Sequence, residues 1–504
     1  VTRSLREKAR SWQLVLGVFF ALTGMPMLQA DQTVDGPFDV VIVLCDDLNP
    51  FYTGFGGDPD SITSNLDALA RESAVFTRCY ATSVVCMSSR TSLVTGLFPH
   101  STGCWGNASD LFVSPRFTTL FSDLKASGYT TAMIGKTHWY AGQGFRDQFP
   151  SLTDYMEGIG IDFFQDVATT FSSRGGKGIY QDFLRSIGKF EAQSKDLTER
   201  LSTNQYLVRP SLLEPEETCD WMMTDLALEY LESTSTSEPF ALMIGYSNPH
   251  SPFDPAGKYA TMYEPESISL RENVEPFRKY GDEYDLAKVR EARAAYLGKI
   301  SFLDALLGRL VTGLQERGTW ERTIFIFTAD HGMAVGEHGN IAKGQFWEEV
   351  ARVPMVMRVP GLTDEGLESD ALVQLFDFYP TLIELAGGEV SPHVQARSFV
   401  PVLKNPEERI WDAVFSEIHH DNELAYLVRD HHYKWFVHRG EEALFDLKTD
   451  PFEQSNLIES SGHKEIAAQL RERLRIFLME EQVNVSAGYI PSAERAKRAS
   501  EEVP

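Results

Sequence analysis

The sequence has little cysteine, a deficit of basic residues and no long apolar run. Its 5 cysteines are too few, among 504 residues, for the disulfide framework of a small secreted domain. The chain carries 46 Lys and Arg against 72 Asp and Glu, a formal net charge of −26. This excess of acid argues against nucleic acid as a partner. No internal repeat is visible, so a repeat architecture is not expected.

The N-terminal segment comes nearest to a membrane span and falls short of one. Its basic residues precede an apolar run over 14–22, well below the roughly 20 residues that a bilayer requires. We interpret residues 1–30 as a secretory signal peptide cleaved near Ala30. No cysteine follows this segment to carry a lipid anchor. The pattern predicts an exported protein, periplasmic or secreted, with no stable membrane anchor.

The chain has enough apolar sequence for a large core. Hydrophobic residues make up 43% of it, which predicts a folded protein with two or more domains, or one large domain with an appendage. Apolar runs rich in β-branched residues predict strands buried on both faces, at 39–45, 130–134, 240–245 and 321–328. Helical patterns lie between them, at 65–73, 118–127, 220–232 and 285–317. This alternation predicts an α/β fold in which functional groups collect at the carboxyl ends of the strands.

The pattern changes after residue 387. Four short strands are expected in an antiparallel meander, followed by an amphipathic helix at 464–479; the strands are 413–418, 424–429, 432–438 and 443–447. We therefore expect a catalytic domain over 31–390 and a smaller C-terminal subdomain over 391–504. Residues 149–215 mix polar, glycine-rich and charged segments, and we interpret them as an insertion whose role the sequence does not disclose.

The most informative stretch is Cys86-Met-Ser-Ser-Arg90, which continues into Thr-Ser-Leu-Val-Thr-Gly96. Its serines and threonine favour a helix start, and Gly96 and Pro99 end the short apolar run that follows. An anion beside Cys86 would meet the positive end of that helix together with Arg90. On chemistry alone Cys86 is a nucleophile with an electropositive neighbour, and the competing interpretation is a buried structural cysteine beside a surface arginine.

Two acidic pairs follow predicted strands. Asp46 and Asp47 end the first strand, and Asp330 and His331 follow the strand over 321–328. One such pair alone is commonly a turn or a helix cap. Two pairs beside a candidate nucleophile favour convergence on a divalent cation. Carboxylates select a hard ion such as Ca²⁺ or Mg²⁺ over zinc, although His331 suits Ca²⁺ least.

Basic and imidazole side chains follow the same strands. Lys136 and His138 come after 130–134, His250 comes after 240–245, and Lys343 trails the second acidic pair. Taken singly, each is by default a solvated or structural residue. In a protein this acidic, however, positive groups near the other motifs carry more weight, because an anionic substrate needs a locally basic pocket.

Together these motifs resemble the type I sulfatases. The signature of that family has a Cys or Ser, a Pro two residues on and an Arg four residues on, ahead of a Thr-Gly pair. Cys86, Arg90 and Gly96 match it, and Ser88 stands at the Pro position. Segments similar to the family's Gly-Lys-x-His, Pro-His-x-Pro and Gly-Glu-His-Gly…Lys motifs follow in the family's order. The resemblance covers about residues 38 to 457 and implies an alkaline-phosphatase-like fold with a large, mostly parallel sheet flanked by helices.

The resemblance implies a sulfuric ester hydrolase. In such an enzyme, a maturation enzyme would oxidise Cys86 to formylglycine. It also implies a Ca²⁺ site, with Mg²⁺ as the alternative. The implied ligands are Asp46, Asp47, modified Cys86, Asp330 and His331. The hydrated aldehyde would attack sulfur. The implied roles of the other groups are charge stabilisation by Arg90, Lys136 and Lys343, protonation of the departing alcohol by His250 alone or with Lys343, and proton removal by His138 as sulfate leaves.

The opening Asp46-Asp47-Leu48-Asn49 is similar to the iduronate-2-sulfatase-like and bacterial polysaccharide-sulfatase branches, which implies a sulfated carbohydrate substrate. Side chains expected as walls of the sugar site are Trp105, Trp139, His419 and His420. Three alternatives stay open. They are a phosphate or phosphonate monoester hydrolase of the same superfamily, a choline-sulfatase-like enzyme, and a non-catalytic sulfated-glycan-binding relative for which Ser88 is the sole support.

Overall fold

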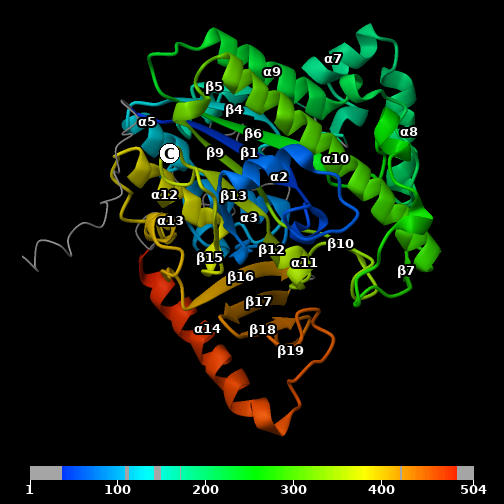
Figure 1. Cartoon of the computed structure of the whole chain (residues 1–504), viewed down its shortest axis with the longest axis vertical. Helices are drawn as coiled ribbons and strands as arrows, with labels where there is room; N and C mark the ends of the chain where they lie inside the picture. The colour runs from blue at the N-terminus through cyan, green and yellow to red at the C-terminus, as the bar shows by residue number, and fades with distance from the viewer. Residues whose placement is uncertain are drawn as a thin grey trace, which may run out of the picture. The chain divides into compact units, whose positions relative to one another are not determined.

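An eight-stranded mixed sheet forms the centre of the computed structural model (Figure 1). Its strands, in spatial order, are β14 (Leu367–Ser369), β2 (Ala74–Phe76), β13 (Met355–Arg358), β9 (Thr323–Ala329), β1 (Asp39–Asp46), β6 (Phe240–Pro249), β4 (Thr130–Gly135) and β5 (Phe163–Gln165). The five strands from β9 to β5 are parallel, whereas β13 is antiparallel to both neighbours. The predicted α/β fold with a mostly parallel sheet is confirmed.

The structure describes residues 37–107, 113–140, 149–167, 169–170, 172–420 and 423–484, without the side chains of 420 and 481–484. The predicted signal peptide at 1–30 lies outside these residues. Across the part of the chain that is described, no helix combines the length and apolar character needed to cross a membrane.

Pairing between the parallel strands aligns their carboxyl ends. Leu44 of β1 pairs with Thr328 of β9 and with Gly245 of β6. Gly245 pairs in turn with Gly135, the last residue of β4. Every residue of β1, β6 and β9 is buried, because helices cover both faces of the sheet. The chain therefore leaves neighbouring strands along a single edge, and the residues that follow each strand are brought close together.

Helices cover both faces of this sheet. On one side α9 (Cys219–Ser233) and α10 (Leu286–Glu316) pack together over β6, with α2 (Ser64–Arg71) beside α10 (Figure 1). On the other side lie α3 (Cys86–Thr95), α5 (Leu120–Ala126) and α12 (Phe378–Leu385). Side chains of Thr119, Thr218 and Asp285 accept hydrogen bonds from backbone N–H groups in the first turns, which fixes where α5, α9 and α10 begin.

The insertion at 149–215 is largely ordered into regular structure. It contains α6 (Leu152–Gly158), β5, α7 (Ile179–Ser186) and α8 (Phe190–Ser202), and β5 forms the end strand of the main sheet. Shorter elements elsewhere are β3 (Cys79–Tyr80), β7 (Phe277–Lys279), β8 (Asp282–Tyr284), β10 (Ala334–Val335), β11 (Ile341–Ala342), β12 (Arg352–Val353), β15 (Val373–Gln374), α4 (Pro99–Thr102), α11 (Glu348–Ala351) and α13 (Val400–Lys404). Single 3₁₀ turns are η1 (Pro50–Tyr52), η2 (Ser172–Arg174), η3 (Pro215–Glu217), η4 (Gly257–Thr261), η5 (Pro265–Ser267), η6 (Trp320–Arg322), η7 (Leu375–Asp377) and η8 (Ser461–His463).

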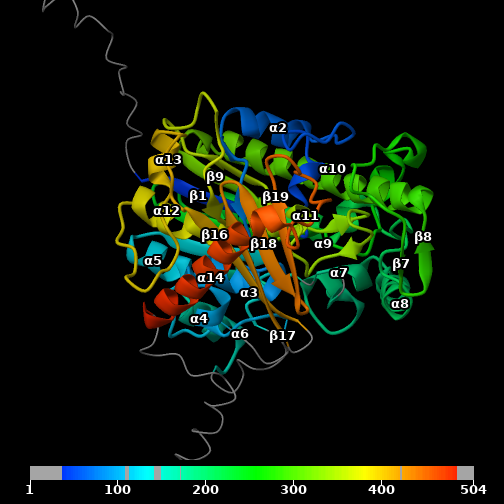
Figure 2. The same ribbon diagram turned by 90° about the horizontal axis from the view of Figure 1, so that it is seen from below.

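A second, four-stranded sheet is built near the C-terminal end. It is an antiparallel meander of β16 (Ala413–His420), β17 (Glu423–Asp430), β18 (Tyr433–His438) and β19 (Glu441–Asp446), as the sequence predicts. Figure 2 shows α14 (Lys464–Asn484) lying across these strands. The helix starts where the sequence predicts and continues five residues beyond the predicted end at 479. The domain boundary near residue 391 stays a prediction.

A buried ion-pair cluster joins this second sheet to the main one. Nζ of Lys434, on β18, lies 3.0 Å from Oε1 of Glu348 and 2.6 Å from Oε1 of Glu453, and the lysine side chain has no exposed surface. Glu348 is the first residue of α11. In the same short helix, the carbonyl of Val350 accepts a hydrogen bond from the N–H of Gly332 at 2.9 Å. The C-terminal sheet thereby supports the loop that follows β9.

Replacement of Lys434 by Met should lower the free energy of unfolding by about 3–5 kcal/mol, because it leaves two buried carboxylates without their cation. The matched variant Lys125→Met removes a lysine that pairs with Asp162 on the surface, and should cost less than about 1 kcal/mol. Chemical denaturation of both variants measures the difference. Equal losses for the two variants would show that the cluster does not hold the sheets together.

Candidate active site

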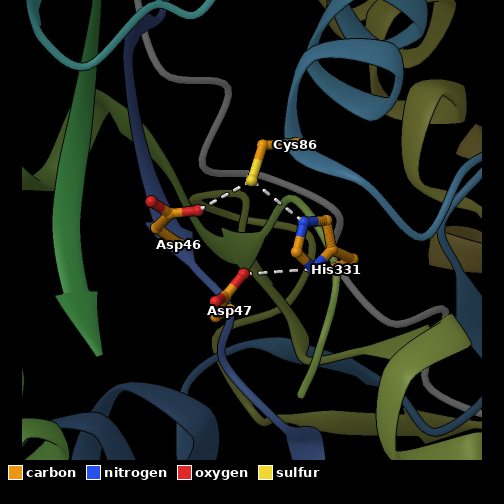
Figure 3. Close-up of side chains that lie close together, drawn as sticks. All are labelled: Asp46, Asp47, Cys86 and His331. Carbon is orange, nitrogen blue, oxygen red and sulfur yellow. Dashed lines mark hydrogen bonds and ion pairs between the residues drawn. The ribbon is translucent and has the colours of Figure 1, made fainter. Parts of the chain in front are cut away.

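Cys86 is the first residue of α3, and its side chain faces the ends of β1 and β9 (Figure 3). Its Sγ lies 3.5 Å from Oδ1 of Asp46, 3.3 Å from Nε2 of His331 and 2.8 Å from Nζ of Lys343. The predicted helix start is therefore correct, and it brings the cysteine to the edge where both acidic pairs lie.

All five cysteines lie among the described residues, and all are unpaired and buried. Burial raises the pKa of four of the thiols, those of Cys45, Cys79, Cys104 and Cys219. Burial and the charge of Asp46 also raise the pKa of Cys86. The charges of Lys136 and Lys343 outweigh them, so the pKa of this thiol is lowered. Cys86 thus differs from the structural cysteines in its electropositive surroundings.

Four side chains with metal-binding atoms converge at this edge. One donor atom from each of Asp46, Asp47, Cys86 and His331 lies within 4.8 Å of the others, and all four residues are buried (Figure 3). Asp47 has φ 65°, a left-handed conformation that is uncommon outside glycine and typical of functional sites. Two carboxylates, an imidazole and the side chain at position 86 form a donor set that fits a divalent cation.

Asp330 lies beside this group and connects its members. Its Oδ1 accepts hydrogen bonds from the N–H of Asp47 at 3.2 Å and of His331 at 2.9 Å. Its Oδ2 is 2.7 Å from Nε of Arg90. Both carboxylate oxygens of Asp330 thus accept hydrogen bonds within the protein, and these bonds align the two acidic pairs. The role of Asp330 as a metal ligand stays a prediction.

Arg90 connects α3 to three strand ends. It has no exposed side-chain surface. Besides Asp330, its guanidinium donates to the carbonyls of Lys136 at 2.8 Å and Cys45 at 3.5 Å, and Nη2 is 4.0 Å from Oδ1 of Asp46. A group held on this many sides keeps a fixed position at the edge of the site.

The two predicted lysines neutralise the first acidic pair. Nζ of Lys136 forms an ion pair with Asp46, and Nζ of Lys343 lies 2.7 Å from Oδ1 of Asp47. Burial raises the pKa of both carboxyl groups. Lys136, His250 and Lys343 outweigh that effect at Asp46. His250, Lys343 and His331 outweigh it at Asp47. Both pKa values are therefore lowered, and the carboxylates remain ionised at neutral pH.

The two predicted histidines lie on the open side of the site. Nδ1 of His250 is 2.6 Å from the carbonyl of Ser251, and its Nε2 is 3.6 Å from Oδ2 of Asp47. Burial, followed by the charges of Lys136 and Arg90, lowers the pKa of His138 to about 3. His138 is therefore a neutral imidazole at neutral pH. Both histidines line a cavity of about 580 Å³, together with Asp46 and Lys136.

The residues that hold Asp47 in its unusual conformation are not among the predicted site residues. The hydroxyl of Tyr296, on α10, donates to the carbonyl of Asp47 and accepts a hydrogen bond from the N–H of Asn49 at 2.9 Å. Nδ2 of Asn49 donates to the carbonyl of Met333 at 3.0 Å. Helical periodicity treats Tyr296 as one more core residue, and no sequence signal marks its hydroxyl as a support of the site.

One expected wall of the sugar site is wrong. Trp139 is 1% exposed, packs edge-on against Phe121 and donates from Nε1 to the carbonyl of Arg90 at 3.1 Å. Its indole therefore belongs to the core beneath α3. Trp105 packs against Tyr426 of the second sheet, and its carbonyl accepts a hydrogen bond from the N–H of His419 at 3.0 Å. Their roles as walls stay predictions; the side chain of His420 lies outside the described residues.

Ser88, which departs from the family signature, is accommodated inside α3. Its side chain is buried, and its Oγ donates to the carbonyl of Cys104 at 2.5 Å. The neighbouring Ser89 donates to the carbonyl of Asp330 at 2.6 Å. The substitution leaves Cys86 and Arg90 in contact with both acidic pairs.

The site and fold agree with comparisons to known proteins. The sulfatase family matches residues 39–388, and the C-terminal family of N-sulphoglucosamine sulphohydrolase matches residues 336–480. The chain belongs to the sulfatase family and is a sulfuric ester hydrolase, as its motifs predict.

Similar proteins include sulfatases of bacteria and animals. The chain is 28% identical to an arylsulfatase of Clostridium perfringens over 457 residues, which are 86% of this chain and 93% of the relative. It is also 28% identical to human iduronate 2-sulfatase, with 74% of this chain and 72% of that protein covered. A phosphonate monoester hydrolase of Agrobacterium radiobacter has the same fold, with a TM-score of 0.75 at 22% identity over 88% of this chain and 96% of that one.

Replacement of Arg90 by Lys should reduce both stability and turnover, because an ammonium group cannot reach Asp330 and the two strand-end carbonyls together. Loss of a hydrogen bond between buried charged groups predicts a decrease of about 1.5–3 kcal/mol in the free energy of unfolding. Arg185→Lys is the matched control, since Arg185 pairs with Asp182 on the surface. An Arg90→Lys enzyme with the control's stability and turnover would contradict this role.

Proposed function

We propose that this protein hydrolyses a sulfate ester on a sulfated carbohydrate, with formylglycine formed from Cys86 and a divalent cation, Ca²⁺ or Mg²⁺. The observation that carries the proposal is the convergence of Cys86, Asp46, Asp47 and His331 on one buried point, with Lys343 in contact with Cys86. This arrangement combines a nucleophile position, a cation site and positive charge for an anionic group.

The formylglycine and the cation would supply, when present, a hydroxyl nucleophile and polarisation of the sulfate oxygens. Position 86 suits that chemistry because it begins α3, a ten-residue helix whose N-terminal end carries partial positive charge. Arg90, fixed by Asp330 and by backbone carbonyls, keeps positive charge beside this point. Negative charge that develops on the sulfate oxygens would therefore be stabilised without rearrangement of the protein.

Lys136 and Lys343 would complete the sulfate site. Each is now paired with one carboxylate of Asp46 and Asp47. A cation held by those two carboxylates would take over their neutralisation, so that the lysines become free to bind sulfate oxygens. The four groups sum to zero charge without the cation, and the cation would make the site positive, which favours a sulfate group.

The two histidines suit opposite proton transfers. The carbonyl of Ser251 accepts a hydrogen bond from Nδ1–H of His250, and Nε2 faces the acidic pair. Burial lowers the pKa of His250, whereas the carboxylates of Asp47 and Asp46 raise it. The protonated imidazole would give its Nε2 proton to the departing alcohol. The depressed pKa of His138 keeps it neutral and ready to accept a proton at position 86 when sulfate is released. In the structure Nδ1 of His138 is buried and has no hydrogen-bond partner among the described residues, so one ring nitrogen is available for this task.

A carbohydrate substrate is supported by the family match and by the relatives. Human iduronate 2-sulfatase is named for a sulfated sugar acid, and the C-terminal match is to an N-sulphoglucosamine sulphohydrolase. Export through the segment at 1–30 would place the protein where extracellular polysaccharides are found. A formylglycine-generating enzyme would be its partner before it becomes active.

The same fold also serves phosphonate monoester hydrolysis, which makes that activity the second candidate. The two are separated by turnover of p-nitrophenyl sulfate, p-nitrophenyl phosphate and p-nitrophenyl phenylphosphonate, esters of one leaving group. We expect the highest kcat/KM for the sulfate. A preference for the phosphate or the phosphonate would favour the second candidate.

The mass of the tryptic peptide from Cys79 to Arg90 tests the proposed nucleophile. Protein made in a host that matures sulfatases should show the loss at position 86 that converts a thiol to an aldehyde. Cys86→Ala should abolish turnover and keep the fold. Cys219→Ala, which also removes a buried cysteine from the first position of a helix, should retain turnover. An intact thiol at position 86, or activity in Cys86→Ala, would contradict the mechanism, and the first result would favour a non-catalytic relative.

Asp330→Asn should lower both the bound metal and the rate, because an amide cannot accept from Asp47, His331 and Arg90 as the carboxylate does. Substitution of a residue that orients metal ligands typically lowers metal affinity or activity by about 10- to 100-fold. Metal content by elemental analysis and kcat measure the effect. Asp377→Asn is the control, since Asp377 is equally buried and accepts hydrogen bonds away from the site, from Gln374 and Arg397. Full metal and full rate in Asp330→Asn would remove Asp330 from the site.

A further inference from the structure

Five parallel strands reach the edge of the sheet that carries the site, and four of them are used by the residues described so far. β9 is followed by Asp330 and His331, β1 ends in the first acidic pair, β6 is followed by His250, and β4 is followed by Lys136 and His138. The fifth strand is β5, within the insertion at 149–215. The residue that follows it is Asp166.

The register of β5 places Asp166 beside the catalytic groups. Ile134 of β4 pairs with Gln165 of β5, so the next residue along, Asp166, lies level with Gly135, the residue before Lys136. Asp166 is exposed to solvent, and it lines the same cavity as Asp46, His138 and His250. The negative charge of this carboxylate would repel a sulfate group in the cavity. We therefore consider a role for Asp166 other than sulfate binding.

Asp166 interacts with the loop that follows β4. Burial raises the pKa of its carboxyl group, and a hydrogen bond with Tyr140 opposes that rise. Thr137, which lies between Lys136 and His138 in sequence, acts in the same way on Tyr140. Asp166 therefore has its neighbours in the same loop that carries two of the catalytic groups, and it lines the same cavity.

The rest of the wall supplied by the insertion is small and polar. Its lining residues include Thr169, Thr170, Ser172, Lys177 and Gln181, with glycines at 175, 176 and 178. Gln181 is 4% exposed, and its Oε1 accepts no hydrogen bond from the described residues. A cavity of about 580 Å³ with such a lining suits a ligand that carries many hydroxyl groups.

We propose that Asp166 is a substrate-binding residue, which accepts a hydrogen bond from a free hydroxyl of the sugar that bears the sulfate, and that Gln181 lines the same subsite. The inference rests on the proposed function and extends it to the identity of the leaving group. A carboxylate at this position repels a second sulfate on the neighbouring carbon. The preferred substrate is therefore a sugar sulfate with a free hydroxyl next to the ester, and an aryl sulfate gains nothing from Asp166.

Selectivity between two kinds of ester tests this assignment. The probes are p-nitrophenyl sulfate and a panel of monosaccharide sulfates, from which the one with the highest kcat/KM for the native enzyme is used. Asp166→Ala should lower the ratio of kcat/KM for the sugar sulfate to that for the aryl sulfate by about 10- to 100-fold, as expected for a lost hydrogen bond to a charged group. Tyr140→Phe, which releases the carboxylate without removing it, should lower the ratio less.

The control is Asp182→Ala, which removes an exposed carboxylate of α7 that pairs with Arg185 outside the cavity. It should leave the ratio at the native value. An unchanged ratio in Asp166→Ala would overturn the inference while leaving the proposed function intact, and so would equal losses on both esters. Hydrolysis of the aryl sulfate with none of the panel turned over would also overturn it. A native, matured enzyme that hydrolyses neither kind of ester would instead contradict the proposed function.

Discussion

The buried ion pair between Arg90 and Asp330 is the interaction on which the rest of the site depends. Both side chains are fully buried, and Nε of Arg90 is 2.7 Å from Oδ2 of Asp330. Either charge alone would be costly to bury, so each requires the other. The remaining hydrogen-bonding groups of the pair hold the neighbouring backbone. The carboxylate accepts hydrogen bonds from the N–H groups of Asp47 and His331, and the guanidinium donates to carbonyls at the ends of β1 and β4. A helix and three strands are fixed relative to one another by two side chains.

Around this pair the protein concentrates charge of both signs. The chain as a whole is strongly acidic, yet Arg90, Lys136 and Lys343 meet at one edge, opposite Asp46, Asp47 and Asp330. The balance is local, and it explains why the two carboxylates remain ionised while burial keeps His138 neutral. Because the three positive and three negative charges cancel at this edge, an anionic substrate meets less repulsion here than over the rest of this acidic protein.

Support for the edge comes from parts of the chain that are remote in sequence. The second sheet contributes Lys434, which pairs with Glu348 of α11, and α11 accepts a hydrogen bond from the loop after β9. The C-terminal family match begins at residue 336, ahead of α11, and so spans both sides of this junction. The insertion contributes β5, which extends the parallel part of the sheet by one strand and ends level with Ile134, near the end of β4. In both cases a short segment, α11 or β5, forms backbone hydrogen bonds with the main sheet or with the loop that follows one of its strands.

Patterns in the sequence are enough to predict the buried strands, the long helices and which polar residues follow the strand ends. Continuous apolar runs identify β1, β6 and β9 because both faces of those strands are covered, and a residue that follows a parallel strand must lie at one edge. Contacts between remote segments are needed to show that Trp139 belongs to the core, that Asp330 aligns its neighbours, that Tyr296 holds Asp47, and that β5 joins the sheet. A strand of three partly exposed residues has no periodicity to recognise, and its pairing depends on the free edge that β4 offers. The direction of an indole, a carboxylate or a hydroxyl likewise depends on partners that lie far away in sequence, and local patterns do not encode them.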